Sequence, residues 1–369
     1  MNQLFRWDQM GLFLLALAAG ILPFAVPEVC AAALREGLTL CSGPLLLSLF
    51  PFLVVSRLLI QCPEGDLLAL PFRLAAWGIG IRTPCAARVL CIGFLGGFAP
   101  AASAAAQAVR TGQLTAEEAD ALLPACICSG PSFVVLTVGQ SLLGSAELGV
   151  LLFASQITAN YLTAALLNRF VGVRSVKPGS AAPASPAPPR LDEILADAAI
   201  TYCKLCGFIL FFRMLAAGAG ALLPAGAGTL CSILLEVCSG CDLASRTGRW
   251  GSLLCCAALS VQGLSVLLQV RTICPPEMTL RPLYRARLLH LPLSLALFYL
   301  LLPGGEADVF STLPARVLLM RRVPPDCALL VFAVCCMAAC TLRSGIRQVE
   351  QKQMARNAGG CCINSKTLL

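Results

Sequence analysis

The sequence predicts an all-α polytopic membrane protein in which two repeats contain broken or re-entrant helices. Of its 369 residues, 58% are hydrophobic and only 12% are charged, whereas soluble domains carry about 25% charged residues. The mean hydropathy is +0.82, and apolar runs near the roughly 20 residues that a bilayer-crossing helix needs recur along the chain. This composition excludes a soluble enzyme, a nucleic-acid-binding protein and a secreted disulfide-rich domain.

The net charge of +8 and the 21 cysteines have simple explanations in such a protein. The basic residues lie mostly between apolar runs, where membrane topology places them. Most cysteines lie inside apolar runs, where a free thiol behaves as a small hydrophobe. The two CxxC pairs, Cys203/Cys206 and Cys238/Cys241, lack the convergent ligand set of a zinc site. We therefore expect no metal ion and no cofactor.

The first half contains three segments long enough to cross a bilayer and two apolar segments that depart from this pattern. The full spans are predicted over Gly11–Leu34, Leu38–Gln61 and Glu147–Phe170. Leu67–Ile81 is too short to cross, so we expect it to lie along the membrane interface. Ala86–Val109 is predicted to be a broken helix, because it contains the structural breaks Gly96, Gly97 and Pro100.

Two short helices are predicted between these segments. Thr115-Ala-Glu-Glu118 has the form of a capping box, and acidic residues fill the first turns of the helix that it opens, where the helix dipole favours them. We expect this helix to lie in water or among headgroups. The second helix covers Pro131–Leu143, with its proline near the first helical position; it is too short to span a bilayer.

The second half repeats this mixture of long and short segments after a linker rich in Pro, Ala and Ser, which we place in the cytoplasm. Its apolar segments are Ile194–Leu223, Leu230–Leu243, Trp250–Val270, Leu288–Leu302 and Cys327–Leu342. The predicted organisation is an N-terminal transmembrane helix over 1–37, a first repeat over 38–170, the linker over 171–191, a second repeat over 192–302, and a C-terminal transmembrane helix with a basic tail over 303–369.

The evidence for a duplication is that one residue pattern occurs in both halves. Phe52-Leu-Val-Val-Ser-Arg57-Leu-Leu in the first half recurs as Phe208-Ile-Leu-Phe-Phe-Arg213-Met-Leu in the second. Each pattern places an arginine five residues after a phenylalanine in an apolar helix. Polar or glycine-containing breaks then follow in the same order in both halves.

The matched breaks are Gly97 with Gly240, and Ser129-Gly-Pro-Ser132 with Gln262-Gly-Leu-Ser265. Repeated halves that each contain a short, interrupted apolar segment are typical of transporter folds with discontinuous helices. Unwound backbone at membrane depth must face protein or a watery cavity, because lipid cannot satisfy its hydrogen bonds. The breaks therefore indicate a shared central site, unless these small residues only permit close helix packing.

The sequence also resembles a known family over about residues 45–302. The residues that carry the resemblance are Phe50-Pro51-Phe52, Gly93-Phe-Leu-Gly-Gly-Phe-Ala-Pro100, Gly112-Gln-Leu-Thr-Ala-Glu-Glu-Ala119, Ser129-Gly-Pro131, Leu234-Leu-Glu-Val-Cys-Ser-Gly240, and Leu259-Ser-Val-Gln-Gly-Leu-Ser265 with Gln269. In order and spacing they are similar to the YlbJ-type sporulation integral membrane proteins, which contain the nucleoside-recognition (Gate) domain.

The resemblance implies a membrane protein of endospore-forming bacteria with two Gate-type repeats. From the repeated, interrupted helices we favour an inverted arrangement of the repeats, with a pseudo-two-fold axis in the membrane plane. It implies a fold shared with nucleoside transporters and iron-transport permeases, although the substrate of the family itself is not established. One departure lies at the first break, where the family usually has a Tyr and then Pro-x-Gly-Ala. Here Phe98-Ala-Pro-Ala-Ala102 lacks that glycine, so ligand chemistry carries over to this break less well than to the others.

Glu236 is the first choice among the polar residues that could bind a solute. A charged group inside a bilayer is costly and usually functional, and this carboxylate precedes the second-half break. The alternative is an ion pair with Arg213 or Arg57. The full set of predicted substrate-binding residues is Ser129, Gly130, Pro131, Ser132, Glu236, Gly240, Gln262, Gly263, Ser265 and Gln269.

The ordinary motifs of nucleophilic, zinc or ATP chemistry are missing from the sequence, and its single histidine, His290, is predicted near a helix start. We therefore expect a non-enzymatic permease or channel for a small polar solute, for which a nucleoside-like molecule is one candidate. We expect it to cross the cell membrane, or a membrane around the forespore, several times. Its partners would be the lipid bilayer and the solute, without nucleic acid. The alternative is a non-transporting scaffold that binds proteins of the maturing spore envelope, in cortex or coat.

Overall fold

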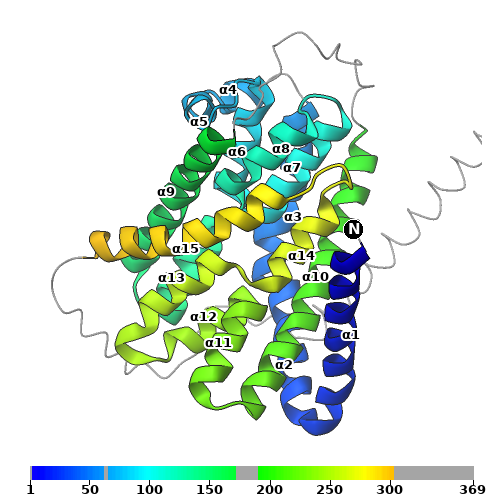
Figure 1. The fold of residues 1–369 in the computed structure, drawn as a ribbon, viewed down its shortest axis with the longest axis vertical. Helices are drawn as coiled ribbons and strands as arrows, with labels where there is room; N and C mark the ends of the chain where they lie inside the picture. Colours follow the sequence, from blue (N-terminus) through cyan, green and yellow to red (C-terminus); the bar gives the residue numbers. More distant parts are fainter. Residues whose placement is uncertain (1, 62–64, 172–189, 303–369) are drawn as a thin grey trace, which may run out of the picture.

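The structure, a computed structural model, describes residues 2–61, 65–171 and 190–302, and this part of the chain is helical (Figure 1). The helices of the first half are α1 (Asn2–Ala25), α2 (Pro27–Ser42), α3 (Pro44–Gln61), α4 (Gly65–Leu68), α5 (Phe72–Gly78), α6 (Pro84–Gly96), α7 (Phe98–Arg110), α8 (Ala116–Cys126), η1 (Ser132–Leu142) and α9 (Ala146–Val171). Those of the second half are α10 (Leu191–Leu222), α11 (Ala225–Leu235), α12 (Val237–Ser245), η2 (Gly248–Trp250), α13 (Gly251–Val261), α14 (Gly263–Ile273) and α15 (Arg281–Leu301).

The predicted fold class is confirmed in its coarse form. Four stretches are long and apolar enough to cross a membrane: Pro27–Leu47, Ala146–Phe170, Leu191–Leu222 and Gly248–Ile273. Large apolar side chains such as Phe24, Phe170 and Leu288 are exposed on the outside of the bundle, which is the surface that a bilayer would cover. The C-terminal segment Cys327–Leu342 and most of the linker lie outside the described residues.

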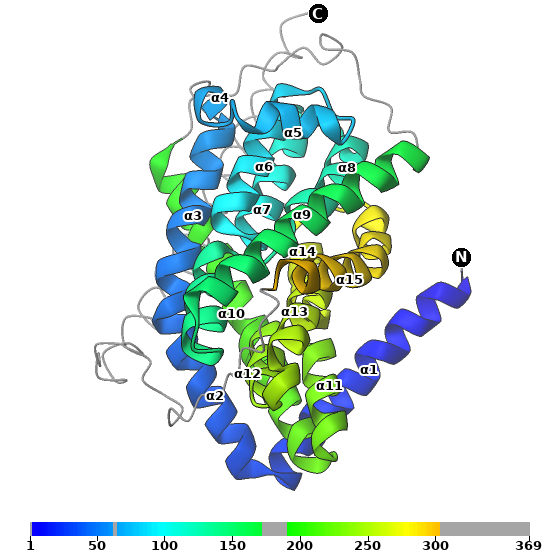
Figure 2. The same cartoon turned by 90° about the vertical axis from the view of Figure 1, so that its left-hand side faces the viewer.

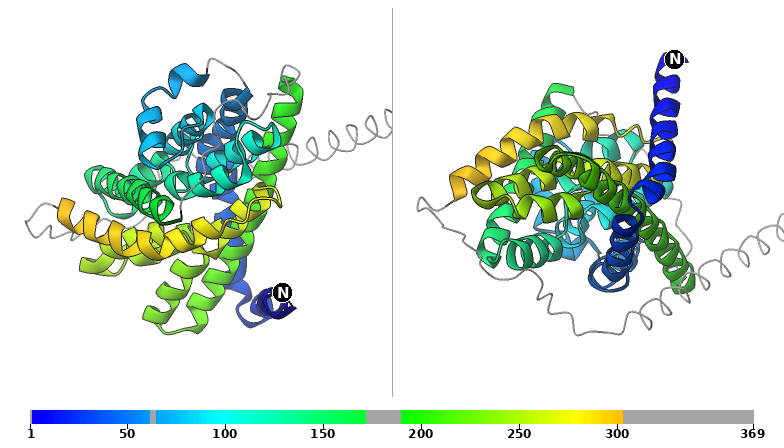
Figure 3. Two further views of the ribbon diagram at one scale, coloured as in Figure 1. Left: turned by 45° about the horizontal axis from the view of Figure 1, so that its top comes forward. Right: turned by 90° about the horizontal axis from the view of Figure 1, so that it is seen from below.

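The N-terminal prediction is wrong in one respect. Instead of one span over Gly11–Leu34, the chain forms α1 and then α2, which starts at Pro27. A proline favours the first turn of a helix, since its missing N–H has no partner there anyway. Helix α1 leans away from the other helices (Figures 2 and 3), and the boundary predicted after residue 37 falls inside α2.

Helices α2 and α3 together lie against the long helix α10 over most of the height of the molecule (Figures 1 and 2). The two sides run in opposite directions, because Arg57 Nη1 contacts Asp197 Oδ2 at 2.8 Å near one end and Arg213 Nη2 contacts Glu36 Oε2 at 2.8 Å near the other. Between them, the hydroxyl of Tyr202 donates to the Cys41 carbonyl. An ion pair thus fixes each end of this antiparallel contact.

Four interruptions divide the helices of the interior. The break between α6 and α7 lies at Gly97 (φ +82°), as predicted. The break between α8 and η1 covers residues 127–131, and that between α13 and α14 lies at Gln262, which is left-handed (φ +63°). The predicted Leu230–Leu243 segment is instead two helices, α11 and α12, separated at Glu236.

The second-half break was predicted at Gly240, but Gly240 lies inside α12. The helix stops at Glu236 because this residue is extended and its carboxylate accepts from two backbone N–H groups of the next helix. Gly240 has a packing role: a Cβ on it would lie 2.8 Å from the Cα of Ile233 in α11. Its small size lets α11 and α12 pack closely side by side.

The capping box at Thr115 is confirmed, but the helix that it opens is not solvated. Glu118 is 2% and Asp120 6% exposed. Glu118 accepts from the Thr83 hydroxyl at 2.6 Å, and the Asp120 carboxylate accepts from the backbone N–H groups of Thr279 and Leu280. Helix α8 is therefore buried in protein, where backbone and hydroxyl donors stabilise its carboxylates.

Helices η1 and α9 form a hairpin of unusual closeness. The η1 segment is wound as a π-helix, a rare conformation that is common at functional sites. A Cβ on Gly149 of α9 would lie 3.0 Å from the Cα of Gly139 in η1. The two backbones therefore touch without side chains between them.

Helix α15 begins earlier than predicted. It starts at Arg281 instead of near Leu288, so His290 lies in its interior and is 1% exposed. Leu280 precedes the helix in a left-handed conformation, held by its N–H bond to Asp120 at 3.1 Å.

Candidate functional site

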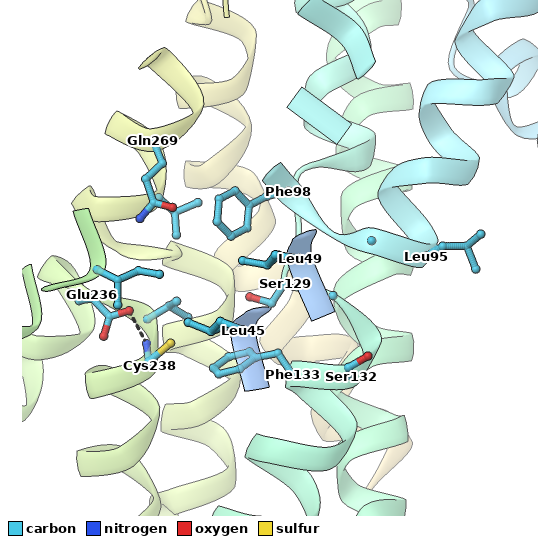
Figure 4. Close-up of a pocket in the computed structure, with 15 residues that line it drawn as sticks. Leu45, Leu49, Leu95, Phe98, Ser129, Ser132, Phe133, Glu236, Cys238 and Gln269 are labelled. Carbon is cyan, nitrogen blue, oxygen red and sulfur yellow. Dashed lines mark hydrogen bonds between the residues drawn. The ribbon is translucent and has the colours of Figure 1, made fainter. Parts of the chain in front are cut away.

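A pocket lies between interrupted helices of the two halves (Figure 4). In Figure 4 its walls come from the first half on one side and the second half on the other. The residues that line it are Leu45, Leu49, Leu95, Gly96, Phe98, Ser129, Gly130, Ser132, Phe133, Ile209, Glu236, Val237, Cys238, Val266 and Gln269. Most are apolar, and the few polar groups are concentrated at the breaks, as in pockets for small ligands.

Glu236 is the one ionisable carboxylate in this lining. Its Oε1 accepts from the N–H of Cys238 at 2.8 Å, and its Oε2 accepts from the N–H of Ser239 at 2.7 Å. The residue is 2% exposed, so the partial positive charge at the N-terminus of α12 compensates a buried negative charge. The predicted alternative of an ion pair is wrong, because Arg213 pairs with Glu36 and Arg57 pairs with Asp197.

Gln269 supplies the second polar group, about two turns beyond the break at Gln262. Its Nε2 donates to the Ser265 hydroxyl at 2.9 Å, while its Oε1 is buried without a hydrogen-bond partner. A buried polar atom without a partner is costly. In Figure 4 the Gln269 side chain lies on the Phe98 side of the pocket, so a bound donor could satisfy that oxygen.

Within each half, the two breaks touch each other. A Cβ on Gly97 would lie 2.6 Å from the backbone nitrogen of Gly130, and one on Gly263 would lie 2.9 Å from the backbone nitrogen of Glu236. Both glycines have positive φ angles, +82° and +69°, which a glycine adopts at no steric cost. Close backbone approach therefore joins the breaks in two pairs, one in each half, and residues of both pairs line the pocket.

The predicted site residues are divided between the pocket and its support. Ser129, Gly130, Ser132, Glu236, Gln269 and Gly96 line the pocket. Gln262, Gly263 and Ser265 lie behind the lining at the second-half break, and Gly97, Pro100 and Pro131 lie at or beside the first-half breaks. Gly240 is the outlier, because it packs α12 against α11.

Sequence reasoning missed a polar cluster directly behind the pocket, between α9, α13 and α15. Gln156 Nε2 donates to the hydroxyl of Ser260 at 3.0 Å, and that hydroxyl contacts the one of Ser294. The Arg287 guanidinium donates to the backbone carbonyls of Ser260 and Ile127, and Asn160 Nδ2 also donates to Ile127 at 3.3 Å.

A pattern in the sequence could have revealed this cluster. Arg287, His290 and Ser294 are spaced three and four residues apart, so they share one face of a helix. Gln156 and Asn160 are four apart and share a face of the predicted span over 147–170. Polar residues that repeat at helical spacing in an apolar segment face protein or a cavity, not lipid.

Among the described residues, no three His, Cys, Asp or Glu side chains are grouped as a metal site requires. Comparison with known protein families, with curated proteins and with solved structures finds no match for this chain.

Proposed function

We propose that this chain is an integral membrane permease or channel of the Gate type, which moves a small polar solute and acts in spore formation. The observation that carries the proposal is that three helix breaks line one pocket that contains Glu236, Ser129 and Gln269, while the fourth break, at Gln262 and Gly263, packs against the Glu236 backbone. Interrupted helices expose backbone donors and acceptors, and membrane proteins use such groups where a solute passes. The sporulation role rests on the YlbJ-type resemblance alone.

The proposed architecture is a pair of inverted repeats. In each half a long apolar stretch is followed by two interrupted helices and then by one uninterrupted helix, in the order α3, α6/α7, α8/η1, α9 and α10, α11/α12, α13/α14, α15. The pairs Arg57–Asp197 and Arg213–Glu36 support an inversion, because they hold the matched arginine helices antiparallel to each other, as an inversion requires. The axis would lie in the membrane plane.

The pocket suits a neutral or weakly cationic solute that carries hydrogen-bond donors. The Gln269 Oε1 and the Glu236 carboxylate are acceptors, and the Ser129 hydroxyl can accept or donate. Phe98 and Phe133 add flat apolar surfaces beside them. A molecule with hydroxyl or amino groups on a ring, such as a nucleoside, combines both requirements.

Flux in proteoliposomes made from the purified chain tests this function. We expect uptake of labelled nucleosides or other small hydroxylated solutes, at least about tenfold reduced by Glu236→Gln, because a charge-assisted bond is worth more than about 1.5 kcal/mol. Ser129→Ala should reduce uptake less, by about fivefold, because it removes one neutral hydrogen bond of about 1 kcal/mol.

Asp242→Asn is the matched control. Asp242 is also a carboxylate of α12, but it pairs with Arg246 at 2.8 Å outside the pocket lining, so its loss should leave uptake unchanged. Equal uptake by wild type and Glu236→Gln would contradict the proposed site.

A second candidate function, a non-transporting scaffold for the spore envelope, is favoured by one observation. Both carboxylate oxygens of Glu236 are already engaged by backbone N–H groups, as a purely structural helix cap would be. If wild-type proteoliposomes move no nucleoside, cation or spore metabolite while the protein is correctly inserted, the scaffold is the better account.

A further inference from the structure

Arg287 is a buried cation that forms no ion pair with any of the described residues. It lies in the second turn of α15 and is 8% exposed. Its Nη1 donates to the Ser260 carbonyl at 3.3 Å, and its Nη2 donates to the Ile127 carbonyl. A buried charge is costly unless nearby polar groups compensate it. For Arg287, these two carbonyl oxygens supply most of that compensation.

Both carbonyls lie at helix ends that the breaks create. Ile127 directly follows the last residue of α8, and Ser260 is the penultimate residue of α13. The last carbonyls of a helix have no partners within it, and together they carry the negative end of the helix dipole. The guanidinium therefore joins the negative ends of two helices that belong to different halves of the chain.

Such converging carbonyl oxygens also have the chemistry of a metal cation site. Sodium ions in transporters bind unwound carbonyls and the C-terminal ends of half-helices. A further oxygen lies nearby on Asn160, whose Nδ2 donates to the same Ile127 carbonyl while its Oδ1 is buried without a partner. In this chain the Arg287 side chain occupies the place between the ends of α8 and α13.

We propose that the Arg287 guanidinium is the resident cation of this fold, positioned where a free monovalent cation would otherwise bind to hold the ends of α8 and α13 together. Arg287 is a positioning residue, since it lies behind the pocket and orients the break that carries Ser129. The proposal predicts that the folded protein needs no sodium. It does not depend on solute transport, because its readout is stability.

The test is the apparent Tm of the full-length protein in detergent, with sodium, potassium or choline as the cation of the buffer. Wild type should unfold at the same temperature in all three. Arg287→Ala should lower the apparent Tm by roughly 5–10 °C, because two hydrogen bonds to a charged group are lost. Millimolar guanidinium, or sodium, should restore part of this loss by entering the vacated space.

Two variants control the size and charge of the side chain. Arg287→Met fills the space with a neutral chain, so its apparent Tm should fall and no added cation should restore it. Arg246→Ala removes an arginine from the ion pair with Asp242, which lies nearer the protein surface, and should show neither loss nor rescue. Should Arg287→Ala not fold, the comparison moves to Arg287→Lys, which keeps the charge and should be more stable than Arg287→Met.

Three results would overturn the proposal. One is an Arg287→Ala protein as stable as wild type. Another is an Arg287→Ala protein that neither guanidinium nor sodium stabilises more than it stabilises Arg287→Met, which is the result that a merely structural arginine would give. The third is wild type that sodium stabilises specifically, since the resident cation would then be a metal ion after all.

Discussion

Glu236 and Gly263 are in contact in the second half, and both are needed there: Glu236 for its carboxylate and Gly263 for its lack of a side chain. The Glu236 carboxylate ends α11 and caps α12, while Gly263 lets the α13/α14 break approach the Glu236 backbone. One residue supplies hydrogen-bond acceptors and the other supplies space. The pocket therefore depends on backbone contact as much as on its polar lining.

Replacement of Gly263 by alanine should show the value of this contact. Gly112 is a matched control, because its φ is also +69° but a Cβ there would meet nothing within 4 Å. Both Gly→Ala variants should lose about 1–2 kcal/mol for the left-handed conformation. Gly263→Ala should lose about 1–3 kcal/mol more through overlap with Leu235 and Glu236. Unfolding in detergent measures both, and equal losses would refute the contact.

Prediction from sequence was most successful for single residues with a strong conformational preference. Gly97 and the Thr115 capping box were identified because glycine and Thr-x-x-Glu have few alternative uses in an apolar segment. The break that lies at Glu236 was predicted four residues too late, at Gly240. An isolated glutamate can either end a helix or pair with an arginine, and the sequence does not distinguish these roles. Arg287 was missed because its carbonyl partners come from breaks whose positions in space the sequence does not specify.

At the scale of elements, the long helix α10 packs antiparallel to α2 and α3, and broken helices of both halves pack against α3 and α10. Its ion pairs lie near opposite ends, and in each the arginine is buried while the carboxylate is about half exposed. Exposed carboxylates are screened by solvent, so each pair contributes less than its short distance suggests. Their main effect is to select one register of α10 against α2 and α3.

Charge exchange across this contact tests the register. Arg57→Asp and Asp197→Arg should each destabilise the protein, and the double variant should recover about 0.5–1 kcal/mol of the summed loss. As a control, Arg57→Asp combined with Asp192→Arg should recover nothing, because Asp192 pairs with Arg190 at the start of α10. Apparent Tm values of the single and double variants provide the measurement; additive losses in the exchanged pair would contradict the contact.

The sequence predicted most of these elements but not their subdivision. Periodic apolar runs identified α9 and α10 to within a few residues, because long uninterrupted segments leave little choice of conformation. The runs over 11–34 and 230–243 are each two helices, because hydropathy does not register a proline at a helix start or a carboxylate that caps one. The burial of α8 was also missed, since Asp120 accepts from backbone N–H groups of a loop more than 150 positions away.

At the scale of the whole molecule, the direction of the long helices makes a prediction about topology. Helices α2 and α3 together span residues 27–61, about 50 Å at 1.5 Å per residue, more than the roughly 30 Å of a bilayer core. Because α10 runs antiparallel to them, their C-terminal ends should lie on opposite sides of the membrane. The start of α10 should lie on the same side as the end of α3.

A compartment-sensitive reporter inserted into the chain measures these positions. Insertions after Gln61 and at Arg190 should report one side, and an insertion after Leu222 should report the other. Protein levels and the apparent Tm confirm that each insertion leaves the fold intact. Reporters after Gln61 and Leu222 that agree with each other would exclude the inverted arrangement.

The backbone contact between Gly139 and Gly149 limits how the pocket can change shape. Because the backbones of η1 and α9 meet at Gly139 and Gly149 with no room for an added Cβ, sliding of one helix past the other is opposed there, and we expect the two helices to move together. Ser132 and Phe133 line the pocket at the start of η1, while Gln156, farther along α9, contacts Ser260 of α13 and His290 of α15. We therefore expect a displacement of the pocket wall at Ser132 to shift α15, the helix that carries Arg287.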